Sequence, residues 1–315
     1  MKRSDLLDTL AGIRQATVGG RRAPHKPLLL LWLFGLHART GSSEVAYPDA
    51  EAPVSALIND YGPPMRDPRA AGRRAAMPFV HLERSLWTLR DADGTPLDTG
   101  FRDDAAALRG AGAVGRLRPE VERLLAQDPA ARADAVRLLL DRHFTPTLEA
   151  AICDRAGLGP PPADRPGLPE DRGTPEFRYT RRRVRSPAFA ETVLRAFAHT
   201  CAMCGYDGAL DGRPVGVEAA HIRWHSQGGP DDLDNALALC SLHHALFDFG
   251  VLGVTADRAV RVSPLYRASS PAGRAVTALQ DRPVALPGPR LTPGSYDFLH
   301  WHDRQVFKHA RPAAH

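Results

Sequence analysis

The chain contains 315 residues, with 41 Lys and Arg against 36 Asp and Glu, so its formal net charge is only +5. This length allows two domains. The longest apolar run, residues 27–36, is about half the length needed to cross a bilayer, and no secretory signal opens the chain. The sequence therefore disfavours a membrane protein, and we expect a cytoplasmic protein with no membrane partner.

Residues 1–157 are predicted to form an α+β domain. Ser4 is expected to cap a first helix, whose apolar residues follow helical spacing: Leu6, Leu7, Leu10 and Ile13. Residues 27–36 are apolar on all sides and predict a central core helix with Pro27 in its first turn. Two strands are expected over residues 78–82 and 86–89, and two helices over 119–125 and 130–144. About 150 residues are enough for a separate hydrophobic core.

Residues 158–175 are rich in Pro and Gly and predict a linker, which leaves residues 176–315 for a second domain. A basic run opens that domain, with only Glu191 against it: Arg178, Arg181, Arg182, Arg183, Arg185 and Arg195. Such a run favours contact with nucleic-acid phosphates and an affinity that falls with salt. A solvated Arg-rich surface is the alternative interpretation.

Four residues of the second domain have the types and spacing of a closed tetrahedral zinc site: Cys201, Cys204, Cys240 and His243. A single Cys-x2-Cys pair could be two buried thiols, but the second pair gives three of the four cysteines one common role. The remaining Cys153 lies in an apolar helical segment, where a free thiol is ordinary. A disulfide is less favoured because no secretory signal is present. We therefore expect a structural Zn²⁺.

The elements around these ligands predict a second metal site. A strand over residues 215–220 delivers His221 at its end, residues 226–234 form a loop rich in Gly, Pro and Asp, and residues 235–249 lead into a helix. On that helix Cys240 and His243 would share one face, and His244 and Asp248 the neighbouring face. One helix could therefore hold zinc on one side and another cation on the next.

The segment that carries these residues resembles the HNH endonuclease family, in its zinc-containing McrA-like branch, over roughly residues 178–262. The resemblance rests on a dozen positions, among them Glu218-Ala-Ala-His221, Gly228-Gly229, Asp234-Asn235, Cys240-Ser-Leu-His243-His244 and Asp248. It implies a zinc-stabilised ββα-metal nuclease domain. It also implies that His221 is the general base, that Asn235 holds the loop and orients that base, and that His244 binds a catalytic divalent cation. Asp248 and Glu218 are further candidate ligands of that cation.

The chemistry of phosphodiester hydrolysis suits these roles, because it needs an activated water and stabilisation of the charge on the leaving oxygen. Imidazole, with an ordinary pKa of about 6.5, is a suitable base, and Mg²⁺ or Mn²⁺ on a histidine and a carboxylate would act as the Lewis acid. One position departs from the family: Ala220 stands where Asp or His often precedes the base. This departure leaves open which ion is used and what Glu218 does. The alternative interpretation is that His221 and His244 are ordinary core or surface histidines without a catalytic role.

The first domain resembles the sulfur-binding domain found upstream of HNH in phosphorothioation-dependent restriction endonucleases. The resemblance rests on His25-Lys26-Pro27-Leu-Leu-Leu-Leu-Trp, Met77-Pro78-Phe79 and Leu86-Trp87. It implies a shallow apolar pocket walled by Met77, Pro78 and His81, beside side chains that hold the DNA: His25, Lys26, Arg73, Arg74 and Arg102. Met77 and Lys26 depart from the aromatic residue and the Arg that the family often has. Without a ligand, Pro78 would simply begin a strand and His25 cap the core helix.

The physical basis of such a pocket is a difference in hydration, because sulfur is larger, softer and more weakly hydrated than a phosphate oxygen. An apolar wall therefore costs less against sulfur, while Lys and Arg give general affinity. We expect an α+β protein in which a DNA-recognition domain is joined to the nuclease domain, forming a type IV-like restriction endonuclease that cuts phosphorothioated double-stranded DNA.

Two other functions stay open. An HNH endonuclease specific for methylated DNA is disfavoured because the first domain has few aromatic residues outside its expected core strands, whereas readers of methylated bases usually flip the base into an aromatic cage. A zinc-containing DNA-binding protein without cleavage activity is disfavoured by the intact His221, Asn235 and His244. Cutting two strands with one such site per chain suggests a homodimer or sequential nicking.

Overall fold

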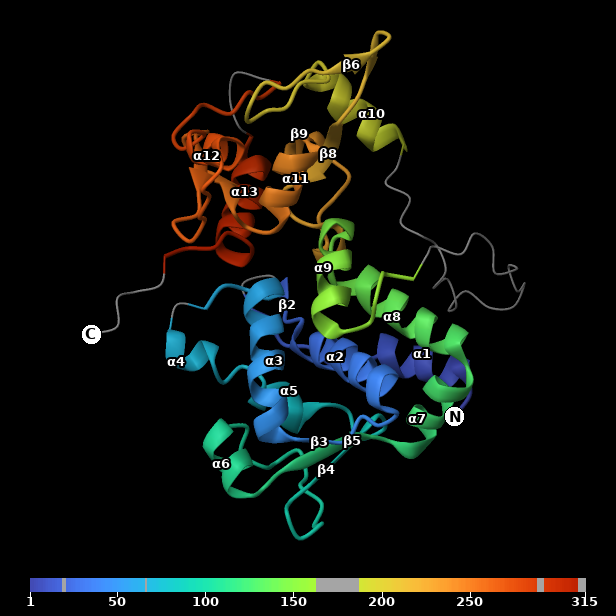
Figure 1. Ribbon diagram of the computed structural model, residues 1–315. Coiled ribbons are helices and arrows are strands. Elements are labelled where there is room, and N and C mark those ends of the chain that lie inside the picture. The colour runs from blue at the N-terminus through green and yellow to red at the C-terminus, as the bar shows by residue number, and fades with distance from the viewer. Residues whose placement is uncertain (19–20, 66, 163–186, 288–291, 311–315) are drawn as a thin grey trace. The chain divides into compact units, whose positions relative to one another are not determined.

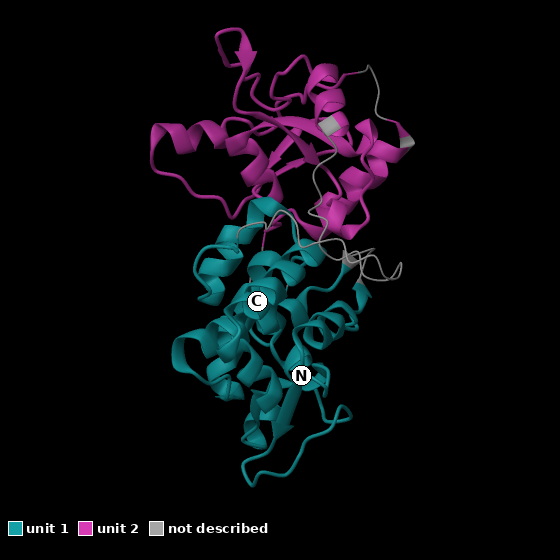
Figure 2. Ribbon diagram, turned by 90° about the vertical axis from the view of Figure 1, so that its right-hand side faces the viewer, with its two compact units in different colours: residues 1–18, 22–182 teal, residues 19–21, 183–315 magenta. Residues whose placement is uncertain are grey.

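The computed structural model describes residues 1–18, 21–65, 67–162, 187–287 and 292–310. The chain divides into two compact units, residues 1–18 with 22–182 and residues 19–21 with 183–315 (Figure 2). Most of the predicted linker, residues 163–175, lies outside the described residues, as do five members of the basic run: Arg178, Arg181, Arg182, Arg183 and Arg185. The predicted domain limits at 157 and 176 therefore stay predictions.

Helices dominate the first unit (Figure 1). They are α1 (Arg3–Ala11), α2 (His25–Thr40), α3 (Tyr47–Tyr61), α4 (Pro68–Ala71), α5 (Ala76–His81), α6 (Ala105–Gly110), α7 (Pro119–Gln127), α8 (Pro129–His143) and α9 (Pro146–Ala156). The strands are β1 (Thr17–Val18), β3 (Val45–Ala46), β4 (Trp87–Arg90) and β5 (Val114–Leu117), and β2 (Arg21–Arg22) lies where the chain passes between the residues of the two units. An antiparallel sheet has the order β3-β5-β4.

Helix α2 is the centre of this unit, as its uniformly apolar sequence predicts. Residues Leu28–Leu31 are all fully buried, and α2 contacts α3, α5, α8 and α9. Gly35 allows the closest approach, because a Cβ there would lie 1.9 Å from the carbonyl oxygen of Ala156 in α9. The helix ends at Gly41, whose φ of 77° is a left-handed conformation that glycine adopts without strain.

Two local predictions for this unit are wrong. Residues 78–82 do not form a strand, because Ala76–His81 is helix α5. A short apolar run does not distinguish the two structures, and Pro78 occupies the first turn, where its missing N–H costs nothing. The side chain of Phe79 is fully buried, and its carbonyl accepts a hydrogen bond from Trp87 Nε1 at 3.0 Å. Both contacts favour the helix. Ser4 is not the cap of α1 either; the N-cap is Lys2, whose N–H donates to Asp5.

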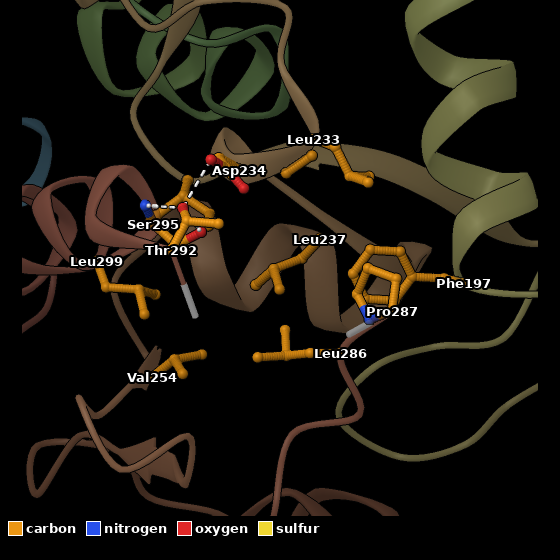
Figure 3. A pocket seen from close by; sticks show the side chains of 12 residues that line it. Phe197, Leu233, Asp234, Leu237, Val254, Leu286, Pro287, Thr292, Ser295 and Leu299 are labelled. Atoms are coloured by element: carbon orange, nitrogen blue, oxygen red, sulfur yellow. Dashed lines mark hydrogen bonds between the residues drawn. The ribbon is translucent and has the colours of Figure 1, made fainter. Parts of the chain in front are cut away.

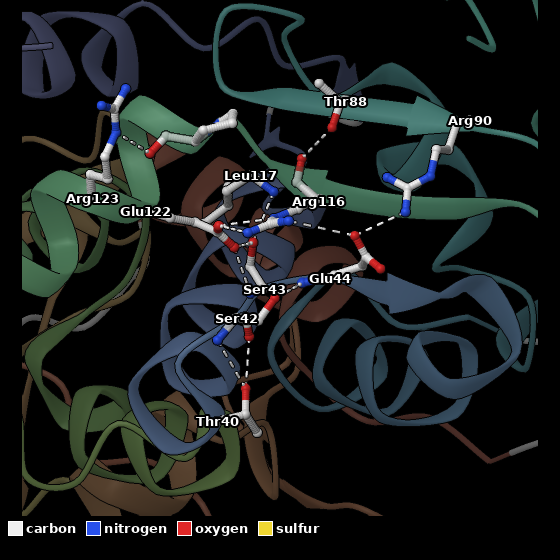
Figure 4. Close-up of polar contacts among 11 residues, drawn as sticks. Thr40, Ser42, Ser43, Glu44, Thr88, Arg90, Arg116, Leu117, Glu122 and Arg123 are labelled. Carbon is white, nitrogen blue, oxygen red and sulfur yellow. Dashed lines mark hydrogen bonds and ion pairs between the residues drawn. The ribbon is translucent and has the colours of Figure 1, made fainter. Parts of the chain in front are cut away.

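A buried polar network fixes the end of the sheet (Figure 4). Glu122, at the start of α7, accepts from the backbone and hydroxyl of Ser43 at 2.7 and 2.6 Å and from Arg116 at 2.6 Å. The Ser43 hydroxyl also accepts from Leu117 N at 2.9 Å. Every oxygen of the buried carboxylate thus has a partner, as a buried charge requires.

The second unit is built around an antiparallel β8–β9 hairpin followed by a helix (Figure 1). In chain order its elements are α10 (Pro187–Ala196), β6 (Ala209–Leu210), β7 (Arg213–Pro214), β8 (Val217–His221), η1 (His225–Gln227), η2 (Leu233–Asn235), β9 (Ala236–Cys240), α11 (Ser241–Asp248), β10 (Leu252–Val254), β11 (Val260–Val262), α12 (Pro271–Thr277) and α13 (Pro293–Gln305). Val217 pairs with Cys240 and His221 with Ala236. Strand, strand and helix thus follow one another in the ββα order.

One prediction for this unit is wrong in detail. Cys240 does not share a helical face with His243, because residues 236–240 form β9 and α11 begins at Ser241. The alternation of Ala and Leu in this segment suits both structures, and pairing with β8 selects the strand. Cys240 stands at the N-cap of α11, so these two zinc ligands come from a strand end and the first turn of a helix, and Cys201 and Cys204 come from a turn between α10 and β6.

A pocket of about 210 Å³ opens behind this hairpin (Figure 3). Its walls are mainly apolar and include Leu237, Val254 and Leu299. At its rim the Thr292 hydroxyl donates to Asp234 at 2.6 Å, which ties the start of α13 to η2. No helix in the described part of the chain is both long and apolar enough to cross a membrane.

Candidate functional site

The predicted zinc ligands converge in the structure. One ligand atom from each of Cys201, Cys204, Cys240 and His243 lies within 4.8 Å of all the others. The Nδ1 atom of His243 is 3.3 Å from Cys240 Sγ and 3.5 Å from Cys201 Sγ. Three thiols and one imidazole around a common point are a donor set that suits Zn²⁺.

Burial makes this cluster costly without a cation. It raises the pKa of the Cys204 thiol to about 12 and also raises the pKa of Cys240. Burial acts in the same direction on Cys201, but hydrogen bonds from His243 and from backbone groups outweigh it and lower the pKa of that thiol to about 6. Thiolate is the form that binds metal, so a bound cation would have to supply the charge that ionises Cys204 and Cys240. A closed set of this kind stabilises the fold around it rather than leaving a position for substrate.

His221 stands at the end of β8, as predicted, with a carboxylate at one ring nitrogen. Its Nε2 lies 2.8 Å from Asp231 Oδ1, and its side chain is 11% exposed. The ring stacks on Phe189 of α10 at 4.4 Å between centroids and 15° between planes. Neither Asp231 nor Phe189 was predicted as a site residue. Their sequence signals, an Asp in a Gly/Pro-rich loop and a Phe in an amphipathic helix, are too common to identify a partner.

Asn235 is fully buried in η2 and bonds to two segments of the loop. Its Oδ1 accepts from Arg223 N at 2.8 Å, and its Nδ2 donates to the carbonyls of Arg223 and Pro230 at 3.0 and 2.9 Å. Gly229 fits beside it only because it has no side chain, since a Cβ would lie 1.8 Å from the Arg223 oxygen. These bonds join the segment after His221 to the segment before Asp231.

His244 lies buried in α11 between two carboxylates. Its Nδ1 is 2.7 Å from Glu218 Oε2, and its Nε2 is 3.3 Å from Asp248 Oδ2. Asp248 is itself buried and accepts from Trp224 Nε1 at 3.0 Å, whereas the Glu218 side chain is 41% exposed. The two carboxylates meet different ring nitrogens, so one ion cannot take all three groups in this arrangement.

Ala220 contributes no ligand, and its side chain is fully buried. Glu218 lies two residues earlier on the same strand, and side chains two apart share a face. The carboxylate near His244 thus comes from Glu218, next to the Ser241 hydroxyl, which donates to it at 2.7 Å.

In the first unit, the start of α2 meets the segment around α5. His25 Nε2 is 3.0 Å from Arg74, which also donates to the carbonyls of Ile58 and Pro63. Arg74 is only 8% exposed, and burial lowers its pKa to about 10. Lys26 Nζ bonds to Glu83 at 2.6 Å, with 11% of its side chain exposed. Three of the predicted DNA-holding residues, His25, Lys26 and Arg74, thus bond to other groups of the protein.

The other predicted residues lie in or near α5. Pro78 is buried and Met77 half-buried within it, Arg73 is exposed just before it, and His81 closes it. His81 Nε2 is 3.2 Å from Asp103 Oδ2. Arg102 is 83% exposed and pairs with Asp104 at 2.9 Å. The acidic partners Glu83, Asp103 and Asp104 were not predicted.

The comparisons with known proteins address both units. Residues 3–160 match the family model of the ScoMcrA-like DNA sulfur-binding domain, and residues 201–255 match that of an HNH endonuclease. No curated protein matches the chain.

Several solved structures are similar. The sulfur-binding domain of ScoMcrA complexed with phosphorothioated DNA is 28% identical, covering 48% of this chain and 94% of that chain with a TM-score of 0.42. That of SprMcrA, also with phosphorothioated DNA, is 24% identical, covering 50% and 95% with a TM-score of 0.39. The type IV phosphorothioation-dependent restriction endonuclease ScoMcrA is 14% identical, covering 88% and 98% with a TM-score of 0.36.

The sulfur-binding model matches half of the chain. The HNH match contains His221, Asn235, His244 and the whole Cys₃His cluster. The chain therefore belongs to the ScoMcrA-like DNA sulfur-binding domain family and carries an HNH endonuclease domain.

Proposed function

We propose that this protein is a modification-dependent, type IV-like restriction endonuclease. Its first unit binds double-stranded DNA at a phosphorothioate, and its HNH domain hydrolyses phosphodiester bonds nearby. The observation that carries the proposal is the presence, in one chain, of a sulfur-binding domain and an HNH domain. Neither half alone would make cleavage depend on a modified backbone.

In the cleavage step, His221 takes a proton from the attacking water. A bond forms between the water oxygen and phosphorus, the bond from phosphorus to the leaving oxygen breaks, and that oxygen takes a proton from solvent. The position of His221 at a strand end, 11% exposed, supports this role because a base must reach both substrate and water. Asn235 holds the loop that follows the base.

Glu218 and His244 are the residues that would hold the catalytic cation, through a carboxylate oxygen and Nδ1. Asp248 would orient the ring through Nε2, as a carboxylate behind a metal-binding histidine often does. Glu218 supports this assignment because it is partly exposed, whereas Asp248 is buried against Trp224. A bound Mg²⁺ or Mn²⁺ supplies a Lewis acid for the developing charge on oxygen. Zn²⁺ on the Cys₃His cluster has a structural role.

For recognition, Met77 and His81, which are partly exposed, would face the sulfur, and the buried Pro78 would support this wall of the pocket. Arg73 and Arg102 would contact phosphates. An ion pair as exposed as that of Arg102 with Asp104 contributes little to stability, so a phosphate can replace the carboxylate at little cost. His25 and Lys26 border the same segment. Arg74 would stabilise this segment rather than contact DNA, because its guanidinium donates to the carbonyls of Ile58 and Pro63.

The test is a cleavage assay with Mn²⁺ on three duplexes of one sequence: phosphorothioated with defined stereochemistry, unmodified and methylated. We expect cutting of the phosphorothioated duplex alone. Cutting of the methylated duplex alone would replace the proposed mark, and equal cutting of all three would remove the sulfur dependence. No cutting of any duplex, with binding intact, would favour a DNA-binding protein.

Cutting of both strands can be done by a homodimer or by sequential nicking. We propose that the protein acts as a homodimer in the cytoplasm. Sedimentation of the DNA complex tests whether a dimer forms.

A further inference from the structure

A carboxylate in the loop before Asn235 points at the proposed base. Asp231 Oδ1 lies 2.8 Å from His221 Nε2, within the range of a strong hydrogen bond. We propose that Asp231 is the positioning residue of His221: it holds the imidazole with its proton on Nε2 and leaves Nδ1 to accept the proton of the attacking water. This inference rests on the proposed function and adds to it a residue and a ring nitrogen.

The hydrogen-bonding inventory of the two groups gives the direction. A carboxylate can only accept, so the ring nitrogen that meets it must carry the proton. A neutral imidazole then has its lone pair on the other nitrogen. When Nδ1 takes a proton from water, the resulting imidazolium stays next to the Asp231 carboxylate, and the bond between them becomes charge-assisted on both sides.

The ring has a second support. Phe189 stacks on its face at 4.4 Å and 15°, and His225 meets it edge-on at 5.8 Å and 86°. His225 Nε2 is also 3.8 Å from Asp231 Oδ1. The stack sets the plane of the His221 ring and the hydrogen bond sets its rotation within that plane. Both are needed to aim one nitrogen at a water molecule.

Asn235 holds the two ends of this pair together. It bonds to Arg223, two residues after His221, and to Pro230, immediately before Asp231. Gly229 permits the close crossing of these segments, as its missing Cβ would meet the Arg223 oxygen at 1.8 Å and Asn235 Nδ2 at 2.8 Å. The loop-holding role proposed for Asn235 thereby acquires a specific target, which is the geometry of the His221–Asp231 hydrogen bond.

The functional test compares Asp231→Asn with Asp232→Asn in the full-length chain. Asp232 is the neighbouring carboxylate, and its side chain bonds to the backbone N–H of Asp234 at 3.0 Å, a bond that Asn can keep. We expect Asp231→Asn to lower the single-turnover cleavage rate about 100-fold, with unchanged affinity for phosphorothioated DNA. Asp232→Asn should cut at the rate of the parent chain, and Asp231→Glu should recover part of the loss.

A second measurement reads the tautomer without any cleavage. Nitrogen-15 NMR of histidine-labelled protein distinguishes protonated Nδ1 from protonated Nε2, and His221→Ala identifies the signal among the 13 histidines. We expect the Nε2–H form in the parent chain and its loss in Asp231→Asn. An Nδ1–H form in the parent chain would overturn the inference.

Two further results would overturn it. One is an unchanged rate in Asp231→Asn. The other is restoration of that variant by a higher Mn²⁺ concentration, which would make Asp231 a metal ligand. If the parent chain cuts no duplex, the proposed function fails instead, and the tautomer measurement still decides how Asp231 and His221 interact.

Discussion

The two units differ in how they hold part of their predicted functional groups: Arg74 and Lys26 of the first unit are as enclosed as the histidines of the second, but Arg102 and His81 are more exposed. In the second unit, His244 is 3% exposed between Glu218 and Asp248, and His221 has one nitrogen on Asp231. In the first unit, Arg102 is 83% exposed and His81 meets an exposed Asp103. Catalysis needs reacting groups in fixed orientations, whereas phosphate binding needs accessible positive charge. The exposure of Arg102 and His81 suits the DNA-binding surface that we propose and the enclosure of His221 and His244 suits the proposed catalytic site, and the predictions below test the two units in turn.

The largest effect should come from Cys201→Ser, which removes a ligand of the proposed zinc. Binding of structural zinc in small domains is worth about 10–16 kcal/mol, so we expect the second unit to lose its fold while the first still binds phosphorothioated DNA. Zinc content, limited proteolysis and a binding assay measure this. Cys153→Ser, at a buried cysteine outside the cluster, is the control and should retain zinc. A zinc-free variant with a normally folded second unit would contradict the structural role.

His221→Ala should separate cutting from binding. We expect cleavage to fall by about 10²- to 10⁴-fold, the usual contribution of a general base, with no change in the dissociation constant for the modified duplex. Single-turnover cleavage and a gel-shift titration on the same DNA give both quantities. Persistent cleavage would remove His221 from its proposed role, and lost binding would mean that the base takes part in recognition.

A smaller effect is expected in the fold of the first unit. Glu122→Gln removes the charge that holds Arg116 and Ser43 together and should lower the free energy of unfolding by about 1–3 kcal/mol. We expect no larger loss because the Arg116 side chain is 39% exposed, so water screens its charge. Glu44→Gln, at a carboxylate that is 40% exposed, is the matched control and should cost less than about 1 kcal/mol. Urea unfolding of both variants gives the comparison; equal losses would show that burial of Glu122 adds nothing.

The same carboxylate gives a dependence on pH. Burial acts to raise the pKa of Glu122, but hydrogen bonds from Arg116 and Ser43 outweigh it and hold the pKa below its ordinary value. A lowered folded-state pKa contributes stability that is present above the unfolded pKa, about 4.3, and is lost as the pH falls through the folded value. Below about pH 4 the parent chain should lose stability more steeply than Glu122→Gln. If the free energy of unfolding fell with pH equally in the two proteins, the ionised Glu122 would not contribute the stability that we assign to it.

The smallest effect is expected for Arg102→Ala. One exposed phosphate contact should change affinity only a few-fold at moderate salt, and it should reduce the slope of log affinity against log salt by about 1. Arg123→Ala, at an exposed position of α7 where the side chain bonds to Pro119 O, is the control. Equal salt slopes for the two variants would remove Arg102 from the DNA-contacting set.

The sequence predicted elements best where a pattern was long or chemically restricted. The uniformly apolar run of α2 and the paired spacing of the Cys₃His cluster each allowed one main interpretation, and the structure contains both. Residues 78–82 and 236–240 were assigned wrongly because a short apolar segment takes its conformation from what packs on it. The edge-on contact of Phe79 with Trp87 and the pairing of β9 with β8 decided these two cases.

The site shows a similar division. His221, His244, Asp248 and Glu218 could be located from the sequence, but Asp231, the hydrogen-bond partner of His221, could not. Asp231 lies ten residues after His221 in a loop, and the bonds of Asn235, with the backbone bond from Gly229 N to Trp224 O, help to bring the two together. Likewise, Glu83 is 57 residues from Lys26 in the sequence but bonds to it at 2.6 Å. Contacts between distant segments depend on the closed fold, which spacing alone does not specify.

The most direct test of the central claim is to move the sulfur. Two duplexes of identical sequence would carry one phosphorothioate each, at positions ten base pairs apart, and the cut sites would be mapped in Mn²⁺. If recognition by the first unit directs the HNH domain, the cut should move with the sulfur and keep a constant offset from it. A cut that stays at one sequence in both duplexes would contradict the account.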